Sequence, residues 1–192
     1  KSEELKTEYI RRNAFGVSID SDAYRIFQSR YFLEDVEKSE ITLVNIHPLV
    51  FIDPYENPLL NRQFVDETGV LLTLNGIIED YFGLSWTEEA QDEDWRWKYF
   101  THGKLGVRVK VRIYNLLNAI SNVNDPFFML HYFVGKVTYH DTEEIERWAS
   151  TSHYTDFLDS LGHTSVMTLM KVRKDFEDEK EIRLLYSYMP ND

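Results

Sequence analysis

The residues with the clearest chemical potential lie near the end of the sequence, in the segment "FEDEKEIRLLY". Glu179, Glu181 and Arg183 recur at every second position, leading into an apolar run typical of a buried strand. Residues two apart in a strand share a face, so these three side chains are predicted to lie in a row. Charged groups on a covered face need partners and commonly mark a functional site. The alternative is a surface ion pair between Glu181 and Arg183, which would stabilise little.

A second candidate is Arg25 in "AYRIF", where a guanidinium interrupts another strand-like segment. The planar fork of arginine suits phosphate or carboxylate, so Arg25 could bind an anion. A surface position or a simple ion pair explains it about equally well.

An aromatic segment, "EDWRWKYF", follows an acidic stretch in the middle of the chain. If it is helical, Trp95 lies beside Tyr99 and Trp97 beside Phe100. Core packing is the favoured explanation, and a platform for a planar ligand is the alternative. The acidic residues before it are typical of a solvated face or a helix start.

The polar turn "DPYEN" carries Asp53, Glu56 and Asn57 around a proline. Turn formation and helix capping are the favoured explanation of these residues. The histidines are scattered without the spacing of a metal-binding helix, so no metal site is predicted. Gly-rich phosphate loops and the serine hydrolase pattern are also missing.

Composition restricts the class of protein. The chain of 192 residues has a net charge of −12, which disfavours broad attachment to nucleic acid or to an anionic membrane. It has no cysteine, hence no disulfide framework or thiol nucleophile. No apolar run approaches the roughly 20 residues that span a bilayer. We therefore expect a cytoplasmic protein without membrane association.

The element pattern predicts an α+β fold: a mixed, largely antiparallel sheet with flanking helices. "KLGVRVKVR" is the clearest strand, with Leu105, Val107, Val109 and Val111 on its core side. "SRYFLEDVEKS" is predicted to be a helix with Phe32, Leu33 and Val36 on one side. Residues 1–20 are predicted to form an N-terminal helical extension and residues 21–192 a single α+β domain.

Several segments, taken in order, resemble the domain-of-unknown-function 2971 family of prokaryotic proteins. The resemblance runs from Tyr24 to Tyr188, and it rests on these stretches: "YRIFQSRYFLEDVEKSEITLVN", "DPYEN", "LSWTEEAQDEDWRWKYFTHGKLGVRVKV", "FVGKVTYHD" and "KVRKDFEDEKEIRLLY". Each motif is weak alone, and their shared order makes the set more specific. The family's layout is similar to that of ADP-ribosyltransferases, in which three strands surround nicotinamide adenine dinucleotide (NAD).

This resemblance implies a role for each candidate residue, with NAD as the candidate substrate. Arg25 would hold its ribose or phosphates, and Glu181 would be the catalytic glutamate of the late strand. Glu179 would complete a catalytic Glu-x-Glu pair. Arg183 would tune Glu181 or bind the pyrophosphate, and Trp95 or Trp97 would stack on a ring of the dinucleotide.

The sequence departs from the family pattern at two places. Ser85-Trp86-Thr87 stands where Cys-Trp-Ser is usual, which keeps a hydroxyl, and Phe100 aligns with a usual tyrosine. The best hypothesis is an enzyme that cleaves the nicotinamide–ribose bond and modifies a protein or nucleic acid, as toxins and defence effectors do. The alternatives are a non-catalytic binding or sensor module for a nucleotide or other anionic ligand, and an interaction domain whose charges are structural.

Overall fold

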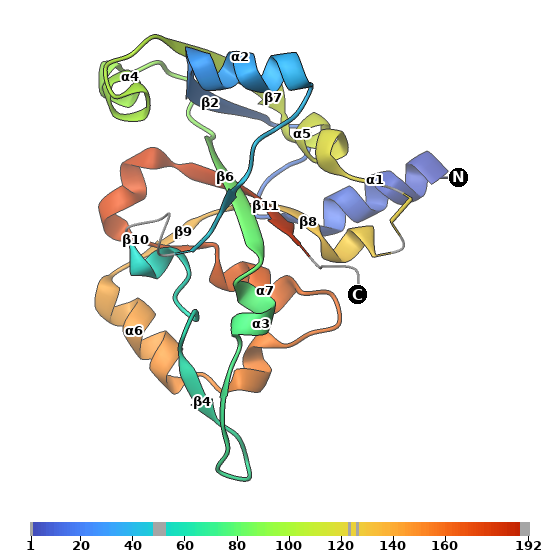
Figure 1. Ribbon diagram of the computed structural model, residues 1–192, viewed down its shortest axis with the longest axis vertical. Coiled ribbons are helices and arrows are strands. Elements are labelled where there is room, and N and C mark those ends of the chain that lie inside the picture. Colours follow the sequence, from blue (N-terminus) through green and yellow to red (C-terminus); the bar gives the residue numbers. More distant parts are fainter. Residues whose placement is uncertain (1, 48–52, 123, 126, 189–192) are drawn as a thin grey trace.

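The fold is centred on one twisted sheet. The structure is a computed structural model and describes residues 2–47, 53–122, 124–125 and 127–188 (Figure 1). Its strands are β1 (Ala14–Phe15), β2 (Asp22–Gln28), β3 (Val44–Asn45), β4 (Gln63–Val65), β5 (Leu71–Thr73), β6 (Tyr81–Thr87), β7 (Gly106–Arg112), β8 (Tyr132–Lys136), β9 (Thr138–His140), β10 (Lys171–Arg173) and β11 (Glu181–Ser187). Its helices are α1 (Ser2–Arg12), α2 (Ser29–Lys38), α3 (Asn75–Ile78), α4 (Asp94–Thr101), α5 (Ile113–Ile120), α6 (Thr142–Thr151) and α7 (His163–Thr168), with 3₁₀ turns η1 (Pro54–Glu56), η2 (Phe128–Leu130), η3 (Tyr154–Phe157) and η4 (Lys174–Glu179).

The main sheet has the strand order β1-β8-β11-β6-β2-β7, with β3 also paired to β6. β1 runs parallel to β8, and the other pairs of this sheet are antiparallel. Helices flank the sheet (Figure 1). The predicted α+β fold with a mixed, largely antiparallel sheet is therefore confirmed.

The sheet opens between β2 and β6. β2 pairs with β7 along its whole length, and β6 does the same with β11. β2 and β6, by contrast, are paired only at Tyr24 and Thr87. Further along β6, β3 takes over as its neighbour, with Val44 opposite Gly83. The two halves of the sheet thus meet at one end of β6 and diverge from there.

Both faces of the central strands are buried. On one face Leu84, Trp86, Ile182 and Leu184 pack in a core that includes residues of α1 and α5. On the other face Leu185 and its neighbours pack against Val166, Leu169 and Met170, in and after α7. Polar groups on this second face of β11 are consequently enclosed and need partners within the protein.

The N-terminal segment belongs to the same core. Ile10 of α1 and Ile19 are buried in the first hydrophobic cluster, and β1 adds an edge to the main sheet. In the described part of the chain, no helix is both long and apolar enough to cross a bilayer.

Two of the predicted elements form, but some of their apolar side chains are more exposed than predicted. The strand "KLGVRVKVR" is β7, and its three valines are half-buried, but Leu105 precedes the strand and is 84% exposed. The helix predicted from Ser29 is α2. Phe32 contacts Phe27 with ring centroids 6.0 Å apart, whereas Leu33 and Val36, expected on the same side, are 56% and 57% exposed.

Candidate active site

The site begins with the pairing of β6 and β11. Ser85 lies opposite Arg183 and Thr87 opposite Glu181, so the polar residues of both strands share one face. Trp86, between them, points into the core on the other face. The Ser85 hydroxyl donates a hydrogen bond of 2.6 Å to Oε1 of Glu181. The alternation of "SWT" on β6 thus matches the alternation of "EIR" on β11.

Glu181 and Arg183 form a buried pair and not a surface one. They are 4% and 3% exposed, respectively. Nε and Nη2 of Arg183 each donate to a different oxygen of the Glu181 carboxylate, both at 2.9 Å. Such a two-point pair fixes the plane of the carboxylate as well as its position. The predicted shared face of Glu181 and Arg183 is therefore correct.

Glu56 completes this cluster from a distant part of the chain. Its Oε2 accepts a hydrogen bond of 2.6 Å from Nη2 of Arg183. Burial alone would lower the pKa of Arg183, but the two carboxylates outweigh it and raise that pKa. Turn formation, the favoured explanation of "DPYEN", holds for Asp53, which accepts from the backbone N–H of Tyr55 at 3.0 Å. It does not account for Glu56.

Glu179 lies outside the strand that the sequence predicts for it. It ends η4, and β11 begins only at Glu181 because Lys180 between them takes a left-handed conformation with φ of 47°. The predicted row on one strand face is wrong for Glu179, since the turn breaks the alternation. Glu179 nevertheless remains near the cluster: burial, then the charges of Glu181 and Glu56, raise its pKa to about 7.

Arg25 approaches the cluster from β2, across the opening of the sheet. Nη1 of Arg25 donates to the backbone carbonyl of Ser85, the residue whose hydroxyl binds Glu181. Burial lowers the pKa of Arg25 to about 10, and the nearby charge of Glu181 opposes that shift. Arg25 and Glu181 are therefore neighbours through Ser85.

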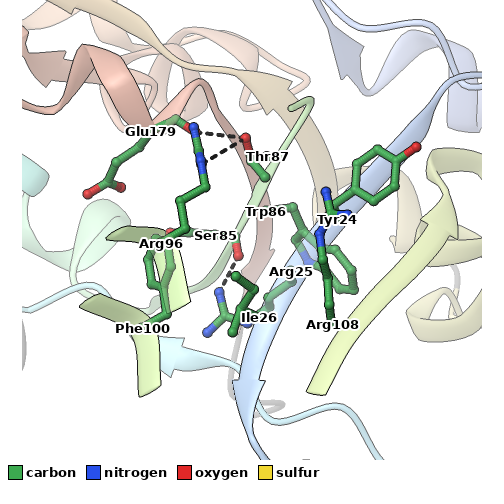
Figure 2. A pocket seen from close by; sticks show the side chains of 10 residues that line it. All are labelled: Tyr24, Arg25, Ile26, Ser85, Trp86, Thr87, Arg96, Phe100, Arg108 and Glu179. Atoms are coloured by element: carbon green, nitrogen blue, oxygen red, sulfur yellow. Dashed lines mark hydrogen bonds between the residues drawn. The ribbon is translucent and has the colours of Figure 1, made fainter. Parts of the chain in front are cut away.

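A pocket occupies the opening between β2 and β6 (Figure 2). The free space inside it is about 30 Å³, room for one or two water molecules and far below the roughly 300–1,000 Å³ of small-molecule sites. Its lining comes from β2, β6, α4, β7 and η4, and consists of Tyr24, Arg25, Ile26, Ser85, Trp86, Thr87, Arg96, Phe100, Arg108 and Glu179. Figure 2 shows Arg96 and Glu179 on one side of it and Tyr24 and Arg108 on the other.

Two hydrogen-bond donors of this lining are buried without a partner among the described residues: Nε of Arg25 and Nε1 of Trp86. A buried polar group without a partner costs free energy, and such groups in native structures usually have a reason. Donors at the wall of a pocket can be satisfied by the acceptor atoms of a ligand.

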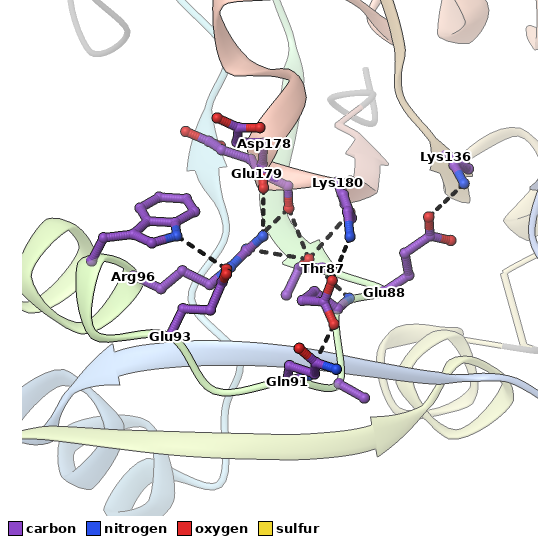
Figure 3. A network of polar contacts seen from close by, with 12 residues as sticks. Thr87, Glu88, Gln91, Glu93, Arg96, Lys136, Asp178, Glu179 and Lys180 are labelled. Atoms are coloured by element: carbon purple, nitrogen blue, oxygen red, sulfur yellow. Dashed lines mark hydrogen bonds and ion pairs between the residues drawn. The ribbon is translucent and has the colours of Figure 1, made fainter.

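Arg96 is a site residue that sequence reasoning missed. It is 3% exposed and donates to the carbonyls of Asp178 and Glu179, and to Oγ1 of Thr87 (Figure 3). These contacts attach α4 to the turn that precedes Glu181. The available signal in the sequence is a single arginine between two tryptophans, Trp95 and Trp97. The aromatic rings suggest packing or stacking more strongly than the arginine suggests a buried contact.

The segment that links β6 to α4 is attached by surface ion pairs as well. Glu88 pairs with Lys136, and Glu89 with Lys180, each at 2.5 Å. Nη2 of Arg108 donates to the carbonyls of Glu89 and Ala90. The acidic stretch, expected to be a solvated face, therefore also connects α4, β7 and β8 to the site (Figure 3).

Trp95 and Trp97 are on α4 but do not line the pocket. Trp95 is 39% exposed and lies beside Tyr99, as predicted, with ring centroids 6.5 Å apart. Trp97 packs against Gly106 of β7, where an added Cβ would lie 2.9 Å from its ring. The aromatic rings of the pocket are those of Tyr24, Trp86 and Phe100 instead.

The described residues contain no group of three or more acidic or histidine side chains placed to hold a metal ion. In comparisons with known proteins, no family model, no curated protein and no solved structure matches the chain.

Proposed function

We propose that the chain is an ADP-ribosyltransferase-like enzyme that cleaves the nicotinamide–ribose bond of NAD. The observation that carries the proposal is the hydrogen bond from Ser85 to Glu181, at the opening of the sheet where Arg25 also binds Ser85. Arg25, Ser85 and Glu181 come from an early, a middle and a late strand. This is the layout that the resemblance to ADP-ribosyltransferases implies.

The proposed chemistry is a dissociation at the anomeric carbon. The bond between this carbon and the nicotinamide nitrogen breaks, and its electron pair leaves with nicotinamide. Positive charge then grows on the ribose, as in glycoside hydrolysis, and a fixed carboxylate stabilises it. Glu181 is 4% exposed and lies behind the pocket lining, so it would act on the ribose across Ser85. Ser85 and Arg183 hold both of its oxygens in place.

The second half of the reaction needs an acceptor and a base. Water, a protein side chain or a nucleic acid would attack the anomeric carbon and give up a proton. Glu179 suits the base role because it lines the pocket and has a pKa raised to about 7, close to the value that favours proton transfer at neutral pH. The proton would pass to its carboxylate.

Only a small part of the dinucleotide would enter the pocket, whose free space is about 30 Å³. Arg25 and Trp86 offer unpartnered donors, and Arg96 and Arg108 add positive charge to the lining, which suits the ribose and phosphate oxygens. We assign ring stacking to Trp86 or Phe100, because Trp95 and Trp97 lie outside the lining. The remainder of NAD would lie at the mouth of the pocket.

The second candidate is a binding or sensor module for a nucleotide or another anionic ligand, without turnover. The observation that favours it is the pairing of Glu181, whose carboxylate oxygens are engaged by Ser85 and Arg183. A carboxylate neutralised in this way would stabilise positive charge less well. The arginines of the lining would bind the ligand in either case.

The deciding experiment incubates the protein with NAD labelled on its phosphate and a cell lysate, while released nicotinamide is measured. Glu181→Gln is the test variant, and Glu177→Gln, an exposed carboxylate of η4, is its matched control. We expect wild type and the control to release nicotinamide, and Glu181→Gln to lose about two orders of magnitude in rate. If wild type releases no nicotinamide, the proposed enzymatic function is wrong. A rise of the thermal midpoint with NAD would then favour the binding module.

A further inference from the structure

The Glu181 carboxylate is held by a guanidinium that is itself held from the other side. Nη1 of Arg183 donates to the carbonyl of Leu169 at 2.7 Å, and Nη2 donates to both Glu181 and Glu56. The guanidinium therefore has anchors on β11, after α7 and on η1. Two of these three anchors, Glu181 and Glu56, are carboxylates, and the third is a neutral carbonyl.

Glu56 is well placed to act as a fixed anchor. Asp53 caps the same turn and forms an ion pair of 2.7 Å with Arg173 of β10. The next residue, Asn57, is buried and donates to the carbonyls of Ile46 and Ile78. The turn is thus attached on both sides of Glu56, so its carboxylate has little freedom to follow a moving Arg183.

Glu56 and Glu181 share one buried cation, Arg183, and the guanidinium of Arg25 is a second cation that interacts with Glu181. Without Glu56, Arg183 would pair with Glu181 alone, and the guanidinium would lose its second anionic anchor.

We propose that Glu56 is a positioning residue for Glu181, acting through Arg183. Glu56 holds the guanidinium in the orientation that presents Glu181 to Ser85, and its carboxylate offsets part of the charge of Arg183 beside Glu181. The inference rests on the proposed NAD cleavage. It predicts that Glu56 affects the rate of the chemical step and not the binding of NAD.

The test compares Glu56→Gln with Glu177→Gln, which makes the same change at an exposed carboxylate of η4. Nicotinamide release gives kcat and KM, and calorimetric titration gives the Kd for NAD. We expect Glu56→Gln to lower kcat by about tenfold or more with Kd within about twofold. Glu177→Gln should keep kcat within about twofold. An unchanged kcat in Glu56→Gln, or an equal loss in Glu177→Gln, would overturn the proposal.

A second measurement does not depend on turnover and separates this inference from the proposed function. Nitrogen-15 NMR resolves the Nη signals of an arginine whose guanidinium cannot rotate. We expect separate Arg183 signals in wild type and in Glu177→Gln, and averaged signals in Glu56→Ala. If the Arg183 signals of folded Glu56→Ala stay separate, Glu56 does not restrain the guanidinium and the proposal is wrong. Failure of wild type to release nicotinamide would instead refute the proposed function.

Discussion

The hydroxyl of Ser85 donates to the carboxylate of Glu181 at 2.6 Å, across two strands whose residues are 96 positions apart in the chain. The register of β6 against β11 makes this contact possible, since Ser85 and Arg183 are paired and Glu181 follows on the same face. The same serine accepts from Arg25 through its backbone carbonyl. Ser85 is therefore the point where the two halves of the sheet are connected at the site.

The first prediction concerns Ser85→Ala. A hydrogen bond to a charged group contributes roughly 1.5 to 3 kcal/mol, which corresponds to about ten- to a hundredfold in rate if it serves the transition state. We expect kcat for nicotinamide release to fall by that factor. Ser165→Ala is the control, because the Ser165 hydroxyl also donates to one acceptor, the carbonyl of Phe157, and lies outside the pocket lining. Equal losses in both variants would argue against a role of Ser85 in the reaction.

A second prediction is the pH dependence of turnover. A raised pKa of about 7 keeps Glu179 protonated in mildly acidic solution, where an ordinary glutamate would be ionised. If Glu179 is the base, kcat should rise as pH increases through about 7 and level off above it. Glu179→Gln should lower kcat and remove this limb of the profile. Survival of the limb in the variant would assign it to another group.

The pKa of Glu179 also predicts an effect on stability. The folded state holds its proton up to a pH of about 7, whereas an ordinary glutamate loses it near 4.5. Between these values the folded state binds more protons, so stability contributed by Glu179 is lost as pH rises through this window. We expect the fall of the urea midpoint between pH 5 and 7.5 to be smaller in Glu179→Gln than in wild type. Glu177→Gln should behave as wild type does.

The sequence was sufficient for the elements whose side chains alternate over a whole strand. Val107, Val109 and Val111 identify β7, and Glu181 and Arg183 are correctly placed on one face of β11. Alternation fails for Glu179 because Lys180 adopts a left-handed conformation that is uncommon for any residue with a side chain. The sequence "DEKE" contains no glycine, proline or asparagine that would predict such a turn.

The contacts that assemble the site lie between segments far apart, so their residue types alone could not indicate them. Glu56 and Arg183 are 127 positions apart and meet only because the fold brings η1 within hydrogen-bond reach of β11. Arg96 was overlooked for a different reason: a helical arginine is usually at the surface, and here the turn before Glu181 covers it. Leu33 and Val36 are the opposite case, apolar residues that are exposed. The apolar pattern of a helix face does not predict how much of that face other elements cover.

Arg96 should be more important for stability than a surface arginine. Its buried guanidinium satisfies the carbonyls of Asp178 and Glu179, and a shorter lysine could not reach both. Breaking such a buried charged contact costs about 3 kcal/mol or more, so Arg96→Lys should lower the free energy of unfolding by that order in urea titrations. Arg12→Lys, in an exposed pair with Glu8, should change it by less than about 0.5 kcal/mol. Similar small effects in both would show that the turn accepts water in place of Arg96.

The last prediction separates ligand binding from catalysis at Arg25. Its Nε is buried at the pocket without a partner among the described residues, so a bound phosphate or ribose oxygen would gain a charge-assisted hydrogen bond. Arg25→Gln removes the charge, and we expect the Kd for NAD to rise by about tenfold or more, because such bonds contribute roughly 1.5 to 3 kcal/mol. Arg112→Gln removes an exposed charge at the end of β7, outside the pocket lining, and should leave Kd within about twofold. Calorimetry with adenosine diphosphate ribose would extend the test to the product side: if Arg25 contacts the ribose or phosphates, its loss weakens product and substrate alike, whereas a contact with nicotinamide would weaken NAD alone.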